Sequence, residues 1–361
     1  MRSIYFLIFY IFLYIFKLEI FGVNILTLIC PFLIFTLSFR NQAFFKVFRH
    51  KPVVWFFLFY LYYSLIVIVD NNLLDSVVVF SNYLYCLMAV LIIDSLSQKE
   101  LNIINTSCLI FVLLFAVLFF IEFAETKNTL IINVFNFKHR TSLAYHILYT
   151  YILFAITSNN KKILISMTAL VTITLFVNSS RAPLIMLLLF ATTILSVNIK
   201  KRYIFSLVIF FSFISTILFD GYFENTYDRF INIFSLDQSG GSNLYRYEAI
   251  TSIVRYLKVY PWGNGLHSFQ EYFDQFTFLN LKTAINLPAD NSFALVAYNT
   301  GIMGLFLFSR TLYSLFLKLN VKSPPFIIAV VFILNCFTDE VFNGSIFLSI
   351  LVLFLSKKRY S

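Results

Sequence analysis

The sequence has 361 residues, of which 60% are hydrophobic and only 12% are charged. A soluble domain carries about 25% charged residues, so this composition excludes a soluble globular protein. The formal net charge of +10 would suit a nucleic-acid binder. However, the basic residues lie mainly in short segments between apolar runs, a placement that orients a membrane protein and argues against a nucleic-acid partner.

Twelve apolar runs have about the length needed to cross a bilayer. In chain order they cover residues 4–18, 23–38, 53–69, 76–95, 102–122, 142–158, 163–178, 182–198, 203–219, 291–308, 326–342 and 345–356. They predict an all-α polytopic integral membrane protein with about twelve transmembrane helices, forming one transmembrane domain over residues 1–361. The first run follows a basic start but lacks a small-x-small cleavage site, so we expect it to be retained as a helix.

The basic residues indicate which side each connection faces. With the N-terminus in the cytoplasm, 17 of the 27 Lys and Arg residues fall on the cytoplasmic side. Half of the others lie in one long loop, where the positive-inside rule is weak. We therefore expect both termini in the cytoplasm. Arg181 then lies on the outer side, in a tight turn between two apolar runs, where a guanidinium needs either water or an anion because hydrocarbon is costly for it.

One connection, residues 220–290, is much longer than the others and is expected on the outer side. Long loops are usually functional or disordered, and this one is rich in Tyr, Phe and Leu, so we expect it to fold. Its run NLYRYEAITSIVRYLKVYP predicts an amphipathic helix that ends at Pro261. Such a helix could lie on the membrane surface. Its apolar positions recur at helical spacing: Leu244, Tyr247, Ile250, Val254 and Leu257.

The same loop carries several cations that could join Arg181 in binding an anion. They are Arg229, Arg246, Arg255, Lys258 and Lys282. Arginine is the side chain best suited to bidentate phosphate contacts, and a group of cations beside a bilayer is what a lipid pyrophosphate requires. The alternative is that these charges are solvated by water or touch lipid headgroups.

Glycines interrupt the loop at Gly240, Gly263 and Gly265. Glycine permits positive φ and a close approach of backbone to ligand, although these residues are also ordinary turn formers and only a weak signal for a phosphate nest. His267 follows in the same GNGLHSF segment on the outer side.

Three carboxylates lie at the outer ends of predicted helices. Asp290 precedes Asn291 at a helix start and is expected to be either an N-cap or a catalytic base. Asp339 and Glu340 follow another helix, where they could polarise an incoming hydroxyl or pair with an arginine of the loop. The four His and four Cys residues show no spacing that suggests a metal site.

Four features, in this order, resemble the superfamily of O-antigen polymerases and ligases in bacterial polysaccharide assembly. They are NSSRAPL at 178–184, the long external loop, GNGLHSF at 263–269, and DNSFALVAYNTGIMGLFLF at 290–308. The spacing from Arg229 to Gly240 also resembles the Arg-x10-Gly pattern of polymerase loops. The resemblance covers about residues 142–356, while the first five helices match only in hydropathy.

The resemblance implies a membrane glycosyltransferase of the bacterial inner membrane whose long loop is periplasmic. Its donor would be a glycan on undecaprenyl pyrophosphate, with no nucleotide sugar, metal or cofactor. A polymerase transfers the growing chain onto a lipid-linked repeat unit, and a ligase transfers it to lipid A-core. Ligases of this superfamily resemble one another in a His before the Asn at 291, where this chain has Asp290, and this difference favours a polymerase. A flippase for lipid-linked sugars is the alternative from another class.

The residue roles follow from the same resemblance. Arg181 and Arg246 would hold the donor pyrophosphate, and a carboxylate from Asp290, Asp339 or Glu340 would assist the acceptor hydroxyl. The remaining candidates for substrate binding are Arg229, Arg255, Gly240, Gly263, Gly265, His267 and Asn291. The implied partners are membrane lipid, a chain-length regulator and a flippase of the same pathway.

Overall fold

The structure is a computed structural model of the whole chain. The part of the chain that it describes comprises residues 2–15, 19–20, 23–39, 48, 50–69, 73–94, 96–126, 134, 140–178, 180–198, 241–266, 268–277, 291–317, 319–320, 323–338 and 346–360. The single transmembrane domain over residues 1–361 and the long loop over residues 220–290 stay predictions.

The described chain is almost entirely helical. Its helices are α1 (Arg2–Tyr10), η1 (Ile11–Ile15), α2 (Ile25–Phe39), α4 (Lys51–Val69), α5 (Leu73–Asp94), α6 (Gln98–Thr126), α7 (Arg140–Thr157), α8 (Lys161–Val177), α9 (Arg181–Asn198), α12 (Gly241–Val259), α13 (Ser268–Phe276), α14 (Ser292–Phe316), α15 (Pro324–Thr338) and α16 (Ile346–Tyr360). Two short antiparallel strands, β1 (Glu19–Ile20) and β2 (Val23–Asn24), link η1 to α2. The prediction of a helical protein is therefore confirmed over this part.

Eleven of the twelve predicted apolar runs overlap helices in the described ranges, and the run at 203–219 lies outside them. Four stretches among the described residues are long and apolar enough to cross a membrane. These stretches are Lys51–Val69, Ser76–Ile93, Gln98–Glu125 and Ser292–Phe316. Shorter apolar helices include the described parts of α7, α9 and α15. The count of twelve spans stays a prediction.

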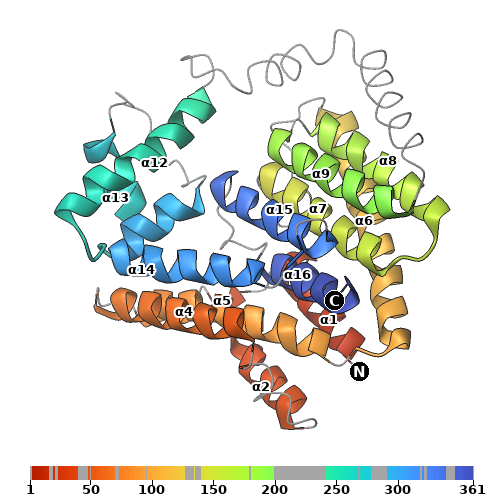
Figure 1. Cartoon of the computed structure of the whole chain (residues 1–361), viewed down its shortest axis with the longest axis horizontal. Coiled ribbons are helices and arrows are strands. Elements are labelled where there is room, and N and C mark those ends of the chain that lie inside the picture. Colours follow the sequence, from red (N-terminus) through yellow and green to blue (C-terminus); the bar gives the residue numbers. More distant parts are fainter. Residues whose placement is uncertain are drawn as a thin grey trace.

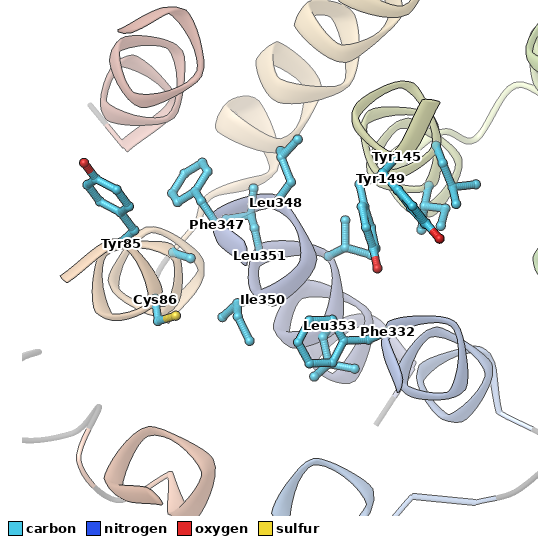
Figure 2. Packing of buried hydrophobic residues seen from close by; sticks show 14 of the residues in the cluster. Tyr85, Cys86, Tyr145, Tyr149, Phe332, Phe347, Leu348, Ile350, Leu351 and Leu353 are labelled. Carbon is cyan, nitrogen blue, oxygen red and sulfur yellow. The ribbon is translucent and has the colours of Figure 1, made fainter. Parts of the chain in front are cut away.

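The C-terminal helix α16 forms the centre of one part of the core. It packs against α5, α7 and α15, and Figure 2 shows its side chains Phe347 to Leu353 pointing toward all three neighbours. Its sequence, IFLSILVLFLSKKRY, is apolar around the whole helix until the last turn, which is typical of a helix buried on every side. The terminal Lys358 then donates to the carbonyl oxygen of Ile93 at 2.9 Å and so satisfies a carbonyl near the end of α5.

A second set of contacts joins the helices that begin or end at the candidate residues. The long helix α14 lies along α4, as Figure 1 shows, and also contacts α12, α13 and α15. Helix α9 packs against α15 as well as against α7 and α8. Thus α15 lies between α9, which begins at Arg181, and α14, which begins just after Asn291. The candidate site is built around these helix ends.

Candidate functional site

The start of α14 meets the end of α15 through Asn291. The side-chain oxygen of Asn291 accepts hydrogen bonds from the amides of Phe293 at 2.9 Å and Ala294 at 3.0 Å, so Asn291 is the N-cap. Its amide nitrogen donates to the carbonyl oxygen of Phe337 at 3.3 Å. The rings of Phe293 and Phe337 stack with centroids 4.5 Å apart. The expectation that Asp290 could be the N-cap is therefore wrong, because Asn291 has this role.

Asn291→Ala is expected to loosen this helix junction. The variant loses the acceptor for two amides, a loss that typically costs about 1 kcal/mol, and also the donor to Phe337. Asn291→Asp should recover the capping part alone, because a carboxylate has no donor for the Phe337 carbonyl. Thermal unfolding in lipid nanodiscs would check the order Asn above Asp above Ala; an Ala variant as stable as the wild type would show that the cap contributes nothing.

Arg181 begins α9 after a turn of only three residues. Helix α8 ends at Val177, and Asn178, its C-cap, donates its backbone amide to Thr174. Ser180, which is buried, then donates to the carbonyl oxygen of Leu175 at 3.2 Å and accepts from Leu184 at 3.2 Å. The predicted tight turn and helix start are thus confirmed, and the side chain of Arg181 lies outside the described part. The first amides of a helix attract anions, so this backbone position adds to the charge of the arginine.

Helix α14 is broken inside its membrane-spanning stretch, at Gly301, where the backbone has φ 65° and ψ −159°. The turn after α12 fills the break. The carbonyl oxygen of Pro261 accepts from the amide of Ile302 at 2.8 Å, and the amide of Gly265 donates to the carbonyl oxygen of Asn299 at 3.0 Å. Backbone groups freed by a helix break need other hydrogen-bond partners, and the 260–266 turn supplies them.

Two glycines make this close approach possible. A Cβ on Gly263 would lie 2.6 Å from the carbonyl oxygen of Asn299, and one on Gly301 would lie 2.2 Å from that of Pro261. Gly263 and Gly265 both have positive φ, 78° and 81°. The close backbone approach predicted for these glycines is therefore real, and in this structure the group approached is α14. Contact of Gly263 or Gly265 with substrate stays a prediction.

Aromatic residues strengthen the same junction. The rings of Tyr256 in α12 and Tyr298 in α14 stack at 4.0 Å. Tyr256 donates to the carbonyl oxygen of Tyr298 at 2.8 Å, and the Tyr298 hydroxyl donates to Ser252 at 2.9 Å. Burial raises the pKa of Tyr256, so its hydroxyl keeps the proton that it donates. On the other side of α14, Asn299 donates to the hydroxyl of Tyr63 in α4 at 2.6 Å.

The sequence analysis did not select these four partners, Tyr63, Ser252, Tyr256 and Tyr298. The available signal was the polar YNTG segment within an otherwise apolar run of α14, because polar residues inside a membrane span usually have partners in the bundle. Tyr298 belongs to this segment, whereas Tyr63, Ser252 and Tyr256 lie on other helices, so no local pattern identifies those three.

Arg255 already has a partner within the loop. Its guanidinium lies 2.7 Å from the carboxylate of Glu248, two turns earlier on the same side of α12, with 29% and 10% of the two side chains exposed. Its Nε also donates to the carbonyl oxygen of Phe276 at the end of α13. Arg255 therefore ties α12 to α13, and a role in binding substrate phosphate stays a prediction.

Paired substitutions can separate these two roles of Arg255. If the residue is structural, Glu248→Ala and Arg255→Ala break the same partly buried pair and should lower stability equally, by about 1–3 kcal/mol for a charged hydrogen bond. The protein level in the membrane should then fall in parallel in both variants, with Glu271→Ala on the exposed face of α13 as the control. Loss of activity in Arg255→Ala alone, at a normal protein level, would instead indicate anion binding by this arginine.

The remaining predicted residues are placed only in part. The backbone of Arg246 lies in α12, nine residues before Arg255, and at 3.6 residues per turn the two positions fall on opposite sides of the helix. Within the described ranges, no group of three or more His, Cys, Asp or Glu residues could hold a metal ion. The other candidates lie outside the described residues: Arg229, Gly240, His267, Asp290, Asp339 and Glu340.

Comparison with known proteins places this region in a family. Residues 166–309 match the family model described as O-antigen ligase. The match begins in α8 and ends in α14, so it includes the turn at Arg181, helices α12 and α13, and the break at Gly301. No curated protein matches the chain. The family covers both ligases and polymerases, which are membrane enzymes that transfer glycans. The match places residues 166–309 in the superfamily of O-antigen polymerases and ligases, and the apolar helices support an integral membrane protein.

Proposed function

We propose that the chain is a polymerase of O-antigen or a related surface polysaccharide, acting at the periplasmic face of the bacterial inner membrane. It transfers a growing glycan from undecaprenyl pyrophosphate onto a lipid-linked repeat unit. The observation that carries this proposal is the hydrogen bond from Asn291 to Phe337. Asp290 directly precedes the first of these residues, and Asp339 follows the second by two positions. Two of the proposed carboxylates, Asp290 and Asp339, are thus close in sequence to the two residues that this hydrogen bond joins.

The proposed cation site is related to this junction through α15. Helix α9 packs against α15, and Arg181 is its first residue. A lipid diphosphate held by Arg181, with Arg246 and Arg229 contributed by the loop, would have its growing negative charge stabilised as the sugar leaves. Fixed charges aimed at developing charge are often the largest contribution to catalysis.

The reaction then follows from these positions. The acceptor sugar hydroxyl attacks the anomeric carbon of the donor glycan, and the bond from that carbon to the diphosphate oxygen breaks. The leaving undecaprenyl pyrophosphate takes the bonding electrons. One carboxylate among Asp290, Asp339 and Glu340 accepts the hydroxyl proton, which makes the hydroxyl a better nucleophile.

A ligase is the second candidate, because the matching family model is described as O-antigen ligase. A ligase passes the finished glycan to lipid A-core instead of to another repeat unit. The residue before Asn291 favours the polymerase: it is Asp290 in this chain, where ligases resemble one another in having His.

A deletion strain distinguishes the candidates. If the chain is a polymerase, its loss should leave lipopolysaccharide capped with single repeat units, and a plasmid copy should restore the ladder. Uncapped core with lipid-linked polymer accumulating would show a ligase instead. Lipid-linked units retained on the cytoplasmic side would show a flippase and contradict both candidates.

A further inference from the structure

Helix α12 carries apolar side chains on two opposite faces. The face against α14 carries Ala249, Ser252 and Tyr256, all of them buried. The opposite face carries Tyr247, Ile250 and Val254, and the last of these is 62% exposed. These three positions recur at helical spacing and form one apolar stripe. In water such a stripe would be unfavourable, so something apolar covers it.

The turn that follows the stripe lies against α14, which is a candidate membrane span. Trp262, which is 72% exposed, follows α12 in the turn that fills the break of α14. The bond from Ile302 to the carbonyl oxygen of Pro261 holds this turn against α14. Directly beyond the break, Ile302, Met303 and Phe306 are all exposed, and they belong to a stretch long and apolar enough to cross the bilayer. Lipid that surrounds α14 therefore reaches Trp262.

We propose that α12 and Trp262 are seated in the interfacial layer of the bilayer, with the apolar stripe in contact with lipid chains. The residue types fit that layer, because Trp and Tyr concentrate at the boundary between hydrocarbon and headgroups. Lys258, which is exposed near the end of the stripe, reaches anionic headgroups from there. The occupant of this face is lipid, and neither a second copy of the chain nor another protein is needed to cover it.

This seating fixes the height of the α12–α13 arm above the membrane. The turn is locked into α14 on one side, and the stripe is held by lipid on the other. The inference depends on α14 spanning the bilayer and on the exposure of α12, and it is independent of the proposed reaction. Its failure would therefore leave the polymerase proposal standing, and the reverse also holds.

Tryptophan fluorescence tests the seating directly, because the chain has only two tryptophans. Trp55→Phe leaves Trp262 as the single reporter in the purified chain reconstituted into vesicles. Phosphatidylcholine brominated at carbons 6 and 7 should lower its emission at least twofold, more than lipid brominated at carbons 11 and 12, while aqueous iodide has little effect. Emission that iodide quenches and brominated lipid does not would overturn the proposal.

The same vesicles show whether lipid or a second copy of the chain covers the apolar stripe. At one chain per vesicle on average, quenching by brominated lipid should be the same as at high protein density. Shielding from iodide that disappears on dilution would show that another copy covers the face and would overturn the assignment to lipid.

Cysteine labelling provides an independent measurement on the helix itself. Val254→Cys lies on the stripe, and Glu271→Cys on the exposed surface of α13 is the matched control. The four native cysteines are buried, and the wild-type chain gives their background. With a membrane-impermeant maleimide, position 254 should react at least tenfold more slowly than position 271. Equal rates would contradict burial of the stripe in lipid.

Discussion

Gly301→Ala should strongly destabilise the chain. Alanine at this position would have to keep a φ of 65° and would bring its Cβ to 2.2 Å from the carbonyl oxygen of Pro261 and 2.4 Å from the carbonyl carbon of Trp262. A left-handed conformation alone costs a non-glycine residue about 1–3 kcal/mol. The overlap is with backbone, which cannot rotate away, so we expect a loss of about 3 kcal/mol or more.

The consequence is release of the 260–266 turn from the break. Either α14 straightens and loses the bonds from Ile302 to Pro261 and from Gly265 to Asn299, or the arm moves away. Thermal unfolding in nanodiscs should show a midpoint lower by about 5 °C or more, with faster proteolysis between α12 and α13. Gly263→Ala should behave in the same way.

Met303→Ala is the matched control, because its exposed side chain lies two residues beyond the break on the same helix. This variant should unfold close to the wild type. If Gly301→Ala also unfolds with the wild-type midpoint, the two glycines are not in contact and the described break of α14 is wrong.

Arg181→Ala should abolish polymer while leaving the protein folded and at its normal level in the membrane. The guanidinium is proposed to stabilise the leaving diphosphate, and removal of one such donor commonly lowers a rate on the order of 100-fold or more. Arg181→Lys should recover part of the activity, because lysine keeps the charge and loses the bidentate geometry. The readout is the length distribution of lipopolysaccharide in a deletion strain that carries each variant.

Arg310→Ala controls for loss of a positive charge on the chain. Arg310 is exposed in the second half of α14, and its guanidinium lies 5.4 Å from the ring centre of Trp55. It is far along the helix from Asn291, so its loss should leave polymer length unchanged. A wild-type ladder from Arg181→Ala would remove this arginine from the proposed site.

Local patterns predicted the elements whose causes are local. The periodic run from Asn243 to Pro261 predicted a helix, and α12 ends at Val259, two residues before the proline. The short NSSRAPL turn predicted a new helix at Arg181, where α9 begins. The sequence allows an N-cap at Asp290, and the structure has it one residue later, at Asn291. Both side chains can accept hydrogen bonds from free amides, so only the backbone geometry decides between them.

The parts that sequence missed depend on contacts between distant residues. The apolar run at 291–308 predicts a continuous helix through Gly301, because a glycine in such a run is compatible with a membrane helix. The break exists because a turn about 40 residues earlier supplies the missing bonds. The short helix α13 was also missed. The helical spacing of Tyr247, Ile250 and Val254 predicts the apolar stripe of α12, and all three side chains are exposed.

The most direct test of the account is turnover by the purified chain in vesicles supplied with a defined undecaprenyl-pyrophosphate-linked repeat unit. The account predicts lipid-linked dimers and longer chains, with one free undecaprenyl pyrophosphate released per bond formed. These products should appear without added nucleotide sugar and should be absent with Arg181→Ala. Repeat units that stay monomeric, with no diphosphate lipid released by the active and folded protein, would contradict it.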